Sequence, residues 1–524
     1  MAPIKSSTFL PSSLLDPPSE LELPRSELTR LLALVSQHVC DINDAATTAA
    51  ASTLDTVNWD PKSHVDAVEL VRSLAKNEDR APEEGVKSPE GFDDLLKFVC
   101  EKATAYGELS YGINHTGPGM QAFIPGGGLL QTGLADLVGN ALNSYVGLWV
   151  GSPGMVQLET NVIKWFTNLI GYPTTGFGSF SSGGSTTNWS ATVCARRRRF
   201  TEEEGFTRAV AYASDQAHMC VVRGCVAAGI PARNVRRVPT DRTTFRMQVE
   251  VLEAMIVDDI ANGWAPFLVV ANAGSTNTGA VDDLNAIAKV VKKHPEVWFH
   301  VDACYGGCFI MTDRGRELLR GIECSDSVSL DLHKSLFLPH GTGLLLVRDA
   351  EYLRYAFSDV NGEYLPRPED TKEDDLMFPS FCDFSLELTR PVRGLRVWLP
   401  LKMHGLGTFR RYLDEKWDLA RWAWKELASI ALIERVTEPQ ISVLSFRWKG
   451  QGKGMDGKRR DAMTLRLMAH VNKGGKVFLA NTRLPEWGVV VRICVLHYRT
   501  HLEHMKTTLE EIRSATEAVL REQV

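Results

Sequence analysis

Short apolar runs that alternate with helical patterns constrain the fold of this chain more than any other feature. From about residue 150 onward, the chain carries β-rich apolar runs at Ala209–Ala213, Phe267–Ala271, Val297–Val301 and Gly343–Val347. Helical patterns lie between these runs, as over Asp282–Lys293 and Arg314–Ile322. Strands that alternate with helices favour a largely parallel sheet. Because such sheets bind ligands beyond the carboxyl ends of their strands, we expect the functional residues at those ends.

The composition is typical of a large globular protein. The 524 residues include 58 Lys and Arg and 64 Asp and Glu. The resulting net charge of −6 is unfavourable for binding a nucleic-acid backbone. Hydrophobic residues make up 44% and charged residues 23%, which argues against wholesale disorder. The 10 cysteines are too sparse for a disulfide scaffold. No apolar run approaches the ~20 residues of a membrane span, and residues 1–20 lack the apolar core of a secretory signal. We therefore expect a cytoplasmic enzyme with neither a nucleic-acid nor a membrane partner.

A lysine and a carboxylate each follow a predicted strand. Lys334 lies beside His333 after an apolar run, where partial burial would lower the pKa of its amine and free it for nucleophilic attack. Asp302 ends the run at 297–301 and would point into the ligand crevice. Taken alone, a surface lysine and a helix-capping aspartate are the ordinary alternatives.

Two further segments suggest a phosphate and a flat ring. Gly183, Gly184 and Ser185 precede a helical pattern, and small residues at a helix start expose N–H groups that can cradle a phosphate. His218 follows the run at 209–213 and could stack on a flat cofactor or relay protons. A plain turn and a helix-start histidine are the corresponding alternatives.

Together these segments resemble pyridoxal 5'-phosphate (PLP) enzymes, and within them the group II amino-acid decarboxylases of the aromatic L-amino acid decarboxylase type. The matching stretches are SDQAH at 214–218, HVDACYGG at 300–307, DLHK at 331–334 and ELTRPVRGLRVW at 387–398. The resemblance covers roughly residues 110–500. It implies the α/β architecture of fold-type I PLP enzymes, with a mainly parallel, seven-stranded sheet in the large domain. The implied parts are a helical N-terminal arm at 1–128, a large PLP-binding domain at 129–394 with a mobile catalytic loop at about 358–383, and a small C-terminal α/β domain at 395–524.

The resemblance also assigns roles around the cofactor. Lys334 would form the internal aldimine with PLP, and Asp302 would keep the pyridine nitrogen protonated, because a nearby anion favours the cation. His218 would lie above the ring and Ala303 below it. The remaining cofactor ligands implied are Gly183, Gly184, Ser185 and His333 at the phosphate and Ser275 near the phenolic oxygen. Relatives often have Asn where this chain has Asp331, and an anion beside a phosphate is unfavourable, so Asp331 is not expected to be a direct ligand.

The implied reaction is decarboxylation of an L-amino acid to the amine and CO2, through an external aldimine and a quinonoid. Tyr364 matches the loop tyrosine that donates the final proton across the dimer interface in this family, so the resemblance implies a homodimer with a shared active site. Relatives with Phe at this position, or with Asn in place of His218, tend to release aldehyde, ammonia and peroxide instead. Decarboxylation is therefore favoured, with an aldehyde synthase or a non-decarboxylating PLP lyase as alternatives.

The substrate pocket departs from that of the aromatic decarboxylases, yet it stays apolar with aromatic walls. An aromatic or bulky apolar amino acid therefore fits best, while the identity of the amino acid stays open. The pocket residues implied are Phe123, Ile124, Pro125, Tyr145, Gly147, Trp149 and Thr389. The pairs Cys304 with Cys308 and Cys220 with Cys225 lack partner pairs at zinc spacing, so no metal site is expected.

Overall fold

The computed structural model describes residues 11–15, 18–47, 115, 117–201, 206–358, 376, 379–450 and 456–522. The chain divides into two compact units, one formed by residues 1–32 and 118–524 and the other by residues 33–117. Helix α2, Arg25–Thr47, contributes residues to both units.

A seven-stranded sheet forms the centre of the larger unit, in the order β1-β7-β6-β5-β4-β2-β3. Neighbouring strands are parallel except where β7 pairs with β1 and with β6. The mainly parallel sheet predicted from the sequence is therefore confirmed. The strands are β1 Phe177–Ser181, β2 Ala209–Ser214, β3 Val235–Val238, β4 Ala265–Asn272, β5 Trp298–Asp302, β6 Ser327–Asp331 and β7 Gly343–Val347.

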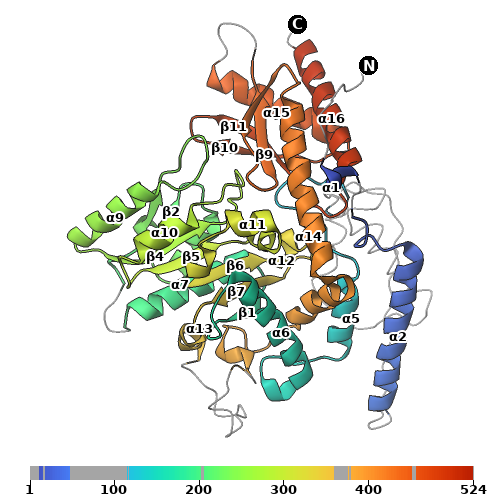
Figure 1. Cartoon of the computed structure of the whole chain (residues 1–524), viewed down its shortest axis with the longest axis vertical. Helices are drawn as coiled ribbons and strands as arrows, with labels where there is room; N and C mark the ends of the chain where they lie inside the picture. The colour runs from blue at the N-terminus through green and yellow to red at the C-terminus, as the bar shows by residue number, and fades with distance from the viewer. Residues whose placement is uncertain are drawn as a thin grey trace, which may run out of the picture. The chain divides into compact units, whose positions relative to one another are not determined.

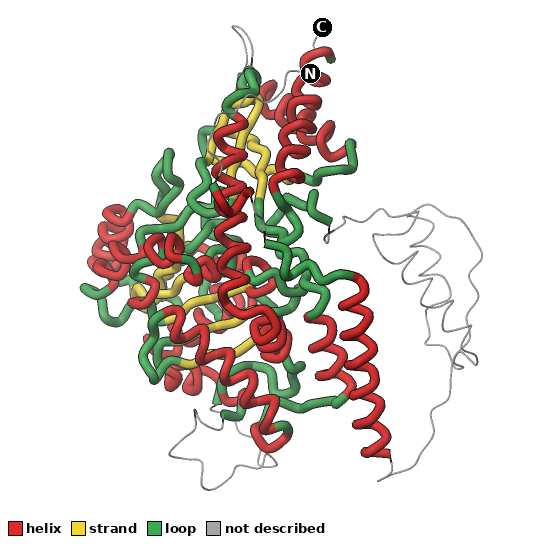
Figure 2. The backbone as a smooth tube through the Cα atoms, turned by 45° about the vertical axis from the view of Figure 1, so that its right-hand side comes forward, coloured by secondary structure: helices red, strands yellow, loops and turns green. Residues whose placement is uncertain are grey.

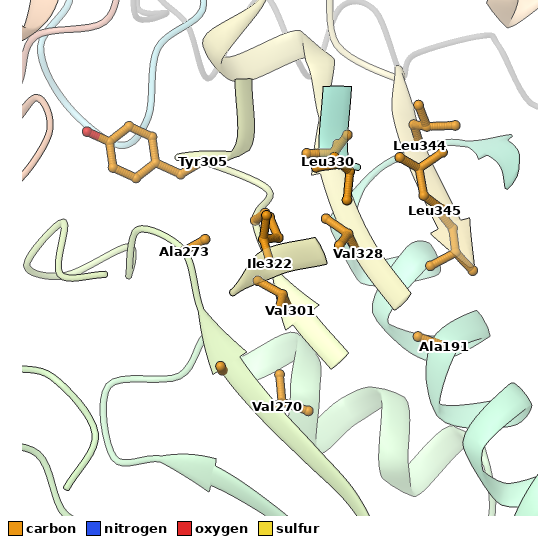
Figure 3. Close-up of a cluster of buried hydrophobic side chains, with 14 of the residues drawn as sticks. Ala191, Val270, Ala273, Val301, Tyr305, Ile322, Val328, Leu330, Leu344 and Leu345 are labelled. Atoms are coloured by element: carbon orange, nitrogen blue, oxygen red, sulfur yellow. The ribbon is translucent and has the colours of Figure 1, made fainter. Parts of the chain in front are cut away.

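The strands of this sheet are hydrophobic because helices cover them. Strands β1, β2, β5, β6 and β7 are buried along their whole length, as expected for a sheet that is covered on both faces. Figure 3 shows part of the resulting core, in which Val301, Val328 and Leu344 lie on one face of three neighbouring strands and Val270 of β4 lies on the opposite face. Tyr305 joins this core at the end of the sheet where β5 finishes. Buried side chains therefore pack around the strands up to this end of the sheet.

Helices pack around the sheet as the alternating sequence pattern predicts. Strands β4 and β5 lie between α10 and α7, which both contact them (Figure 1). The helices that precede residue 360 are α1 Ser12–Leu15, α5 Thr132–Ala141, α6 Pro153–Ile170, α7 Gly184–Arg199, α8 Met219–Ala227, α9 Val249–Ala261, α10 Leu284–Val291, α11 Asp313–Leu318, α12 Leu332–Ser335 and α13 Ala350–Phe357. Short 3-10 turns are η2 Trp149–Gly151, η3 Ala232–Asn234, η4 Gly307–Met311, η5 Ile322–Cys324 and η7 Phe381–Asp383. None of the helices in the described ranges combines the length and apolarity that crossing a bilayer requires.

A smaller, antiparallel sheet follows in the order β10-β11-β9-β8. Its strands are β8 Ile433–Thr437, β9 Val443–Trp448, β10 Ala480–Leu484 and β11 Gly488–Cys494. Figure 2 shows these strands beside helices, which are α14 Arg393–Leu427, α15 Gly457–Lys473 and α16 Leu502–Arg521. Helix α14 is interrupted at Gly405, whose φ of 73° is unfavourable for other residues, and it contacts both the small sheet and β1 of the large one.

The basic run Arg196–Arg199 ends α7, where positive charges interact favourably with the negative end of the helix dipole. Its guanidinium groups also lie over aromatic rings, at 4.8 Å from the Phe206 ring for Arg196 and 4.7 Å from the Tyr355 ring for Arg197. Arg198 and Arg199 lie over the rings of Trp298 and Phe200 in the same way. The run is therefore accounted for by packing at the end of a helix.

Candidate active site

The predicted functional segments gather at one edge of the large sheet. Strands β1, β2, β4, β5 and β6 run in the same direction, so their carboxyl ends meet at that edge. A cavity of about 340 Å³ opens there. Among its lining residues are the predicted Gly183, Gly184, Ser185, His218, Ser275, Asp302, His333 and Lys334. The structure thus brings together segments that are far apart in the sequence.

Lys334 lies in α12, directly after β6. Its Nζ is 2.9 Å from Oδ2 of Asp331, and only 23% of the lysine side chain is exposed. Burial alone would lower the pKa of this amine, but the charges of Asp331 and Asp302 outweigh burial and raise the pKa above its usual range. In the chain by itself, the amine is therefore a protonated ammonium held by an ion pair.

Asp302 ends β5 and is 8% exposed. Its Oδ1 accepts a hydrogen bond from Cys304 N at 3.2 Å, and Cys220 Sγ lies 4.0 Å from Oδ2. Within the described ranges, no basic side chain forms an ion pair with this carboxylate. A cationic ring nitrogen that enters the cavity would therefore meet a negative charge that has no direct counter-ion.

The loop at Gly183 and Gly184 disfavours any side chain, through close contacts at Gly184 and through backbone conformation at Gly183. A Cβ on Gly184 would lie 2.6 Å from Cys304 Sγ and 2.9 Å from Asp331 Oδ2, and Gly183 has a φ of +152°. Gly184 opens α7, and helix geometry leaves the N–H groups of Gly184 and Ser185 without an intrahelical acceptor. These groups and the helix dipole form a site for an anion.

Two histidines with lowered pKa values also line the cavity. His218 caps α8 by accepting a hydrogen bond from Cys220 N at 3.2 Å on its Nδ1. Burial lowers the pKa of His218, although the charge of Asp302 works against this effect. His333 Nδ1 is 3.2 Å from Thr342 O, and burial lowers the pKa of its ring as well. Both rings are therefore neutral near pH 7, which suits stacking and hydrogen bonding.

Ser275 and Ala303 occupy turns after β4 and β5. Ser275 is 3% exposed, and its Oγ lies 2.6 Å from Oγ1 of Thr278. Ala303 is 1% exposed, and its N donates to Ser329 O, which ties the end of β5 to β6. Ala303 is close to the cavity in sequence, but it is not among the cavity-lining residues.

A buried polar network behind the cavity was missed from the sequence. His300 Nδ1 is 2.8 Å from Ser327 Oγ, and its Nε2 is 3.2 Å from Oδ1 of Asn188. Asn188 in turn donates to Gly184 O at 2.8 Å, which links β5, β6 and the glycine loop. Burial lowers the pKa of His300 to about 4, so the ring is a neutral part of the frame. Strand alternation could have predicted a role for His300, because residues two apart in a strand, such as His300 and Asp302, point to the same face of β5.

Other cavity-lining residues also received no role from the sequence: Ser182, Thr186, Cys220, Asn272, Gly274, Thr276, Cys304, Tyr305 and Asp331. Most of them flank a predicted residue by one or two positions, so they follow the same strand ends. The thiols of Cys220 and Cys304 have pKa values raised mainly by burial, which makes them poor nucleophiles.

None of the predicted substrate-pocket residues lines this cavity, as far as the described residues show. Ile124 and Pro125 are buried, whereas Phe123 is 51% exposed with a φ of 55°. The backbone of this segment does contact the backbone next to the lysine, because a Cβ on Gly126 would lie 2.1 Å from His333 O. The first predicted pocket segment therefore packs against the segment that carries Lys334.

The second group of predicted pocket residues gathers elsewhere. A Cβ on Gly147 would lie 1.9 Å from Leu388 O and 2.8 Å from the Tyr145 hydroxyl, so these residues pack tightly. Trp149 N donates to Ser380 Oγ at 3.2 Å, and Thr389 is exposed. Within one chain, this group lies outside the lining of the cavity.

Tyr364, the predicted proton donor, lies outside the described residues, as does most of the predicted loop at 358–383.

Comparisons with known proteins find similar decarboxylases. The pyridoxal-dependent decarboxylase conserved domain matches residues 83–449. An aromatic-L-amino-acid decarboxylase of Bacillus atrophaeus is 32% identical over 426 residues, which cover 81% of this chain and 86% of the relative. A phenylacetaldehyde synthase of Arabidopsis thaliana is 28% identical over 457 residues, with 84% and 89% covered. The crystal structure of Oryza sativa TDC with PLP and tryptamine superposes with a TM-score of 0.78 at 23% identity over 95% of this chain and 99% of that one, so the fold is shared.

Proposed function

Because the chain belongs to the pyridoxal-dependent decarboxylase family, we propose that it decarboxylates an L-amino acid with an aromatic or bulky apolar side chain. Family membership confirms the resemblance found in the sequence motifs. The protein is a carboxy-lyase that uses pyridoxal 5'-phosphate. The observation that carries the proposal is the cavity that the Lys334 amine and the Asp302 carboxylate line together.

The glycine loop fits the phosphate of this cofactor. Gly184 has no room for a Cβ and Gly183 has a backbone conformation that disfavours one, while the backbone N–H groups at the start of α7 lack intrahelical acceptors. These two residues and Ser185 would hold the phosphate, with the neutral His333 ring as an additional hydrogen-bond partner.

The chemistry of the remaining groups fits the ring and the aldehyde of the cofactor. Asp302 would hold a proton at the ring nitrogen, because its charge is otherwise unpaired. His218 would stack on the ring, and Lys334 would bind the cofactor and release it to the substrate amine. Ser275, which lines the cavity, would add a contact from the turn after β4, while the contact of Ala303 stays a prediction from the resemblance.

When bound, the cofactor supplies a ring that accepts the electron pair left by the departing carboxylate. The proton that Asp302 holds at the ring nitrogen makes the ring a stronger electron acceptor. Tyr364 would then deliver a proton to the carbon that has lost CO2. The presence of both Tyr364 and His218 supports release of the amine over oxidation to the aldehyde.

We also propose a cytoplasmic homodimer with active sites shared between subunits. Phe123 and Leu386 are 51% and 71% exposed, and Thr389 is exposed with them. A second copy that covers these surfaces would bring the predicted pocket residues to a cavity that they do not line within one chain. The described cysteines are free thiols, which suits a reducing compartment.

The test is to incubate the PLP-loaded enzyme with each common amino acid and to measure CO2, amine, aldehyde and peroxide together. We expect CO2 and amine in equal amounts from an aromatic or bulky apolar amino acid. Peroxide and aldehyde in place of amine would assign the chain as an aldehyde synthase. Absence of CO2 from every amino acid would overturn the proposal.

A further inference from the structure

Asp331 has no role in the reaction proposed above, yet it forms the ion pair with the lysine that the reaction requires. It ends β6 and is 3% exposed, and its Oδ2 lies 2.9 Å from Nζ of Lys334. Its other oxygen, Oδ1, is buried and accepts no hydrogen bond. Burial of an incompletely paired carboxylate costs free energy, so this position calls for a chemical explanation.

The position of Lys334 creates a proton problem for cofactor loading. The amine can form a bond to the aldehyde of the cofactor only after it has lost a proton. The charges of Asp331 and Asp302 hold the pKa of Lys334 above its usual range in spite of burial. The lysine therefore stays protonated near neutral pH unless a group in contact with it takes the proton.

Asp331 is the base in direct contact with that ammonium. The other titratable groups that face it among the described residues are His333 in α12, His218 and Cys220 at α8, Asp302 and Cys304 at the end of β5, and Cys494 in β11. His333 Nε2 is 3.8 Å from Asp331 Oδ2, beyond hydrogen-bond distance. The pKa of Cys304 is well above the usual value for a thiol because it is buried, so that thiol stays neutral.

The glycine loop provides a trigger for the transfer. A Cβ on Gly184 would lie 2.9 Å from Asp331 Oδ2, so an anion held by the N–H groups of this loop is close to the carboxylate. Two neighbouring negative charges repel each other, so an anion bound at this loop would act directly on the ion pair of Asp331 with Lys334. The same repulsion is the reason why Asp331 was not expected to bind the phosphate directly.

We propose that Asp331 is the acid–base group through which Lys334 is loaded with pyridoxal phosphate, an inference that rests on the proposed function. Oδ2 takes one proton from the ammonium, and the freed amine forms a C–N bond with the aldehyde carbon. The carbonyl oxygen leaves as water, with one proton from Asp331 and one from the amine nitrogen. A protonated C=N bond and the Asp331 carboxylate remain, so no proton is exchanged with solvent.

The experiment measures how fast the visible absorbance of the lysine-bound cofactor appears when PLP is mixed with cofactor-free protein at a series of pH values. Because Asp331 supplies the base internally, the wild-type rate should vary little across neutral pH. The Asp331→Asn variant must lose the proton to solvent, so its rate should fall about 100-fold at pH 7 and rise about tenfold per pH unit. Asp326→Asn is the matched control, because it removes a carboxylate just before the opposite end of the same strand and should load like wild type.

Faster loading of Asp331→Asn, or a profile as flat as that of wild type, would show that the ion pair is structural and would overturn the proposal. If this variant does not fold, Asp331→Ser replaces it in the same measurement. The pH profile of the wild-type loading rate is also a test, because a rate that rises tenfold per pH unit excludes an internal base. The failure of the proposed function looks different: wild type would then gain no visible absorbance with PLP, or would gain it without releasing CO2 from any amino acid.

Discussion

Among the described residues that line the cavity, Lys334 carries the only primary amine, so its removal gives a direct prediction. Lys334→Ala should gain no visible absorbance above that of free PLP when the cofactor is added, and amine formation should fall by more than about 1,000-fold. Absorbance titration and product analysis measure the two effects. Lys289→Ala, which removes an exposed lysine from α10, should behave like wild type. Retained absorbance and turnover in Lys334→Ala would refute the site.

Gly184 gives a second prediction at the scale of a residue. In Gly184→Ala, the new Cβ would meet Cys304 Sγ and Asp331 Oδ2 at 2.6 and 2.9 Å, so the loop must shift away from the cavity. We expect cofactor affinity to weaken by about 1–3 kcal/mol, the usual cost of overpacking. Equilibrium titration with PLP tests this, with Gly154→Ala as control because a Cβ at Gly154 meets nothing within 4 Å. Equal affinity in the two variants would contradict the tight packing of this loop.

The start of α16 depends on a buried cluster of charges. His501 Nε2 lies 2.6 Å from Glu22 Oε1, and its Nδ1 lies 2.6 Å from Glu415 Oε1. Lys416, wholly buried beside Glu415, donates to Glu415 Oε2 at 2.7 Å. Burial works to lower the pKa of His501, but its hydrogen bonds with Glu22 and Glu415 raise that pKa overall. The imidazolium thus joins the N-terminal arm to α14 and α16.

This cluster predicts how stability depends on pH. Because the folded pKa of His501 is above the unfolded value of about 6.5, its contribution is fully present below that pH and is lost as pH rises through the folded pKa. His501→Gln should lower the unfolding free energy by about 1–3 kcal/mol in mildly acidic solution and by less in alkaline solution. Denaturant unfolding at several pH values measures this, and the partly exposed His470→Gln serves as the control. A loss in His501→Gln that grows with pH would contradict the assignment.

At the scale of elements, the sequence predicted what depends on local pattern. The expected runs at 209–213, 267–271, 297–301 and 343–347 match β2, β4, β5 and β7 within one or two residues, because buried strands are apolar throughout. Each motif follows such a strand, so the residues around the cavity were accessible from the sequence. The antiparallel direction of β7 could not be predicted from the sequence, since it depends on tertiary pairing with β1 and β6. The contact of Asp331 with Lys334 depends on the turn at α12 in the same way, and the interpretation of Asp331 as an unhelpful anion missed it.

At the scale of the whole molecule, the sequence predictions concern domain boundaries and the surfaces between domains or subunits. Local sequence patterns do not determine such surfaces. The boundary expected at 394/395 falls at the start of α14, which is interrupted at Gly405 and contacts both sheets, so this boundary does not separate the two sheets from a shared element. The division into 1–128, 129–394 and 395–524 stays a prediction. The assignment of the pocket residues from Phe123 to Thr389 also stays a prediction, since these residues do not line the cavity within a single chain.

A mixing experiment tests the proposed sharing of active sites. Lys334→Ala and Tyr364→Phe should each fail to make amine at the wild-type rate as pure dimers. If Tyr364 acts across the interface, a mixed dimer combines the intact lysine of one subunit with the intact tyrosine of the other at one site. Subunit exchange should then restore about a quarter of wild-type amine formation, because about half of the dimers are mixed and each has one complete site. No gain above the average of the two pure variants would mean that Lys334 and Tyr364 act within one subunit.

The strand order of the large sheet has a consequence for how the protein is made on the ribosome. Strand β1 leads directly into the glycine loop, but its neighbour in the sheet is β7, which is translated much later. A Cβ on Gly343 at the start of β7 would lie 2.5 Å from Gly183 Cα, so the loop rests against this late strand. A nascent chain that stops before residue 343 therefore leaves β1 without a partner and the anion site without its support. Cofactor capture must follow synthesis of β7, and until then the edge of β1 is open to wrong pairing with other chains.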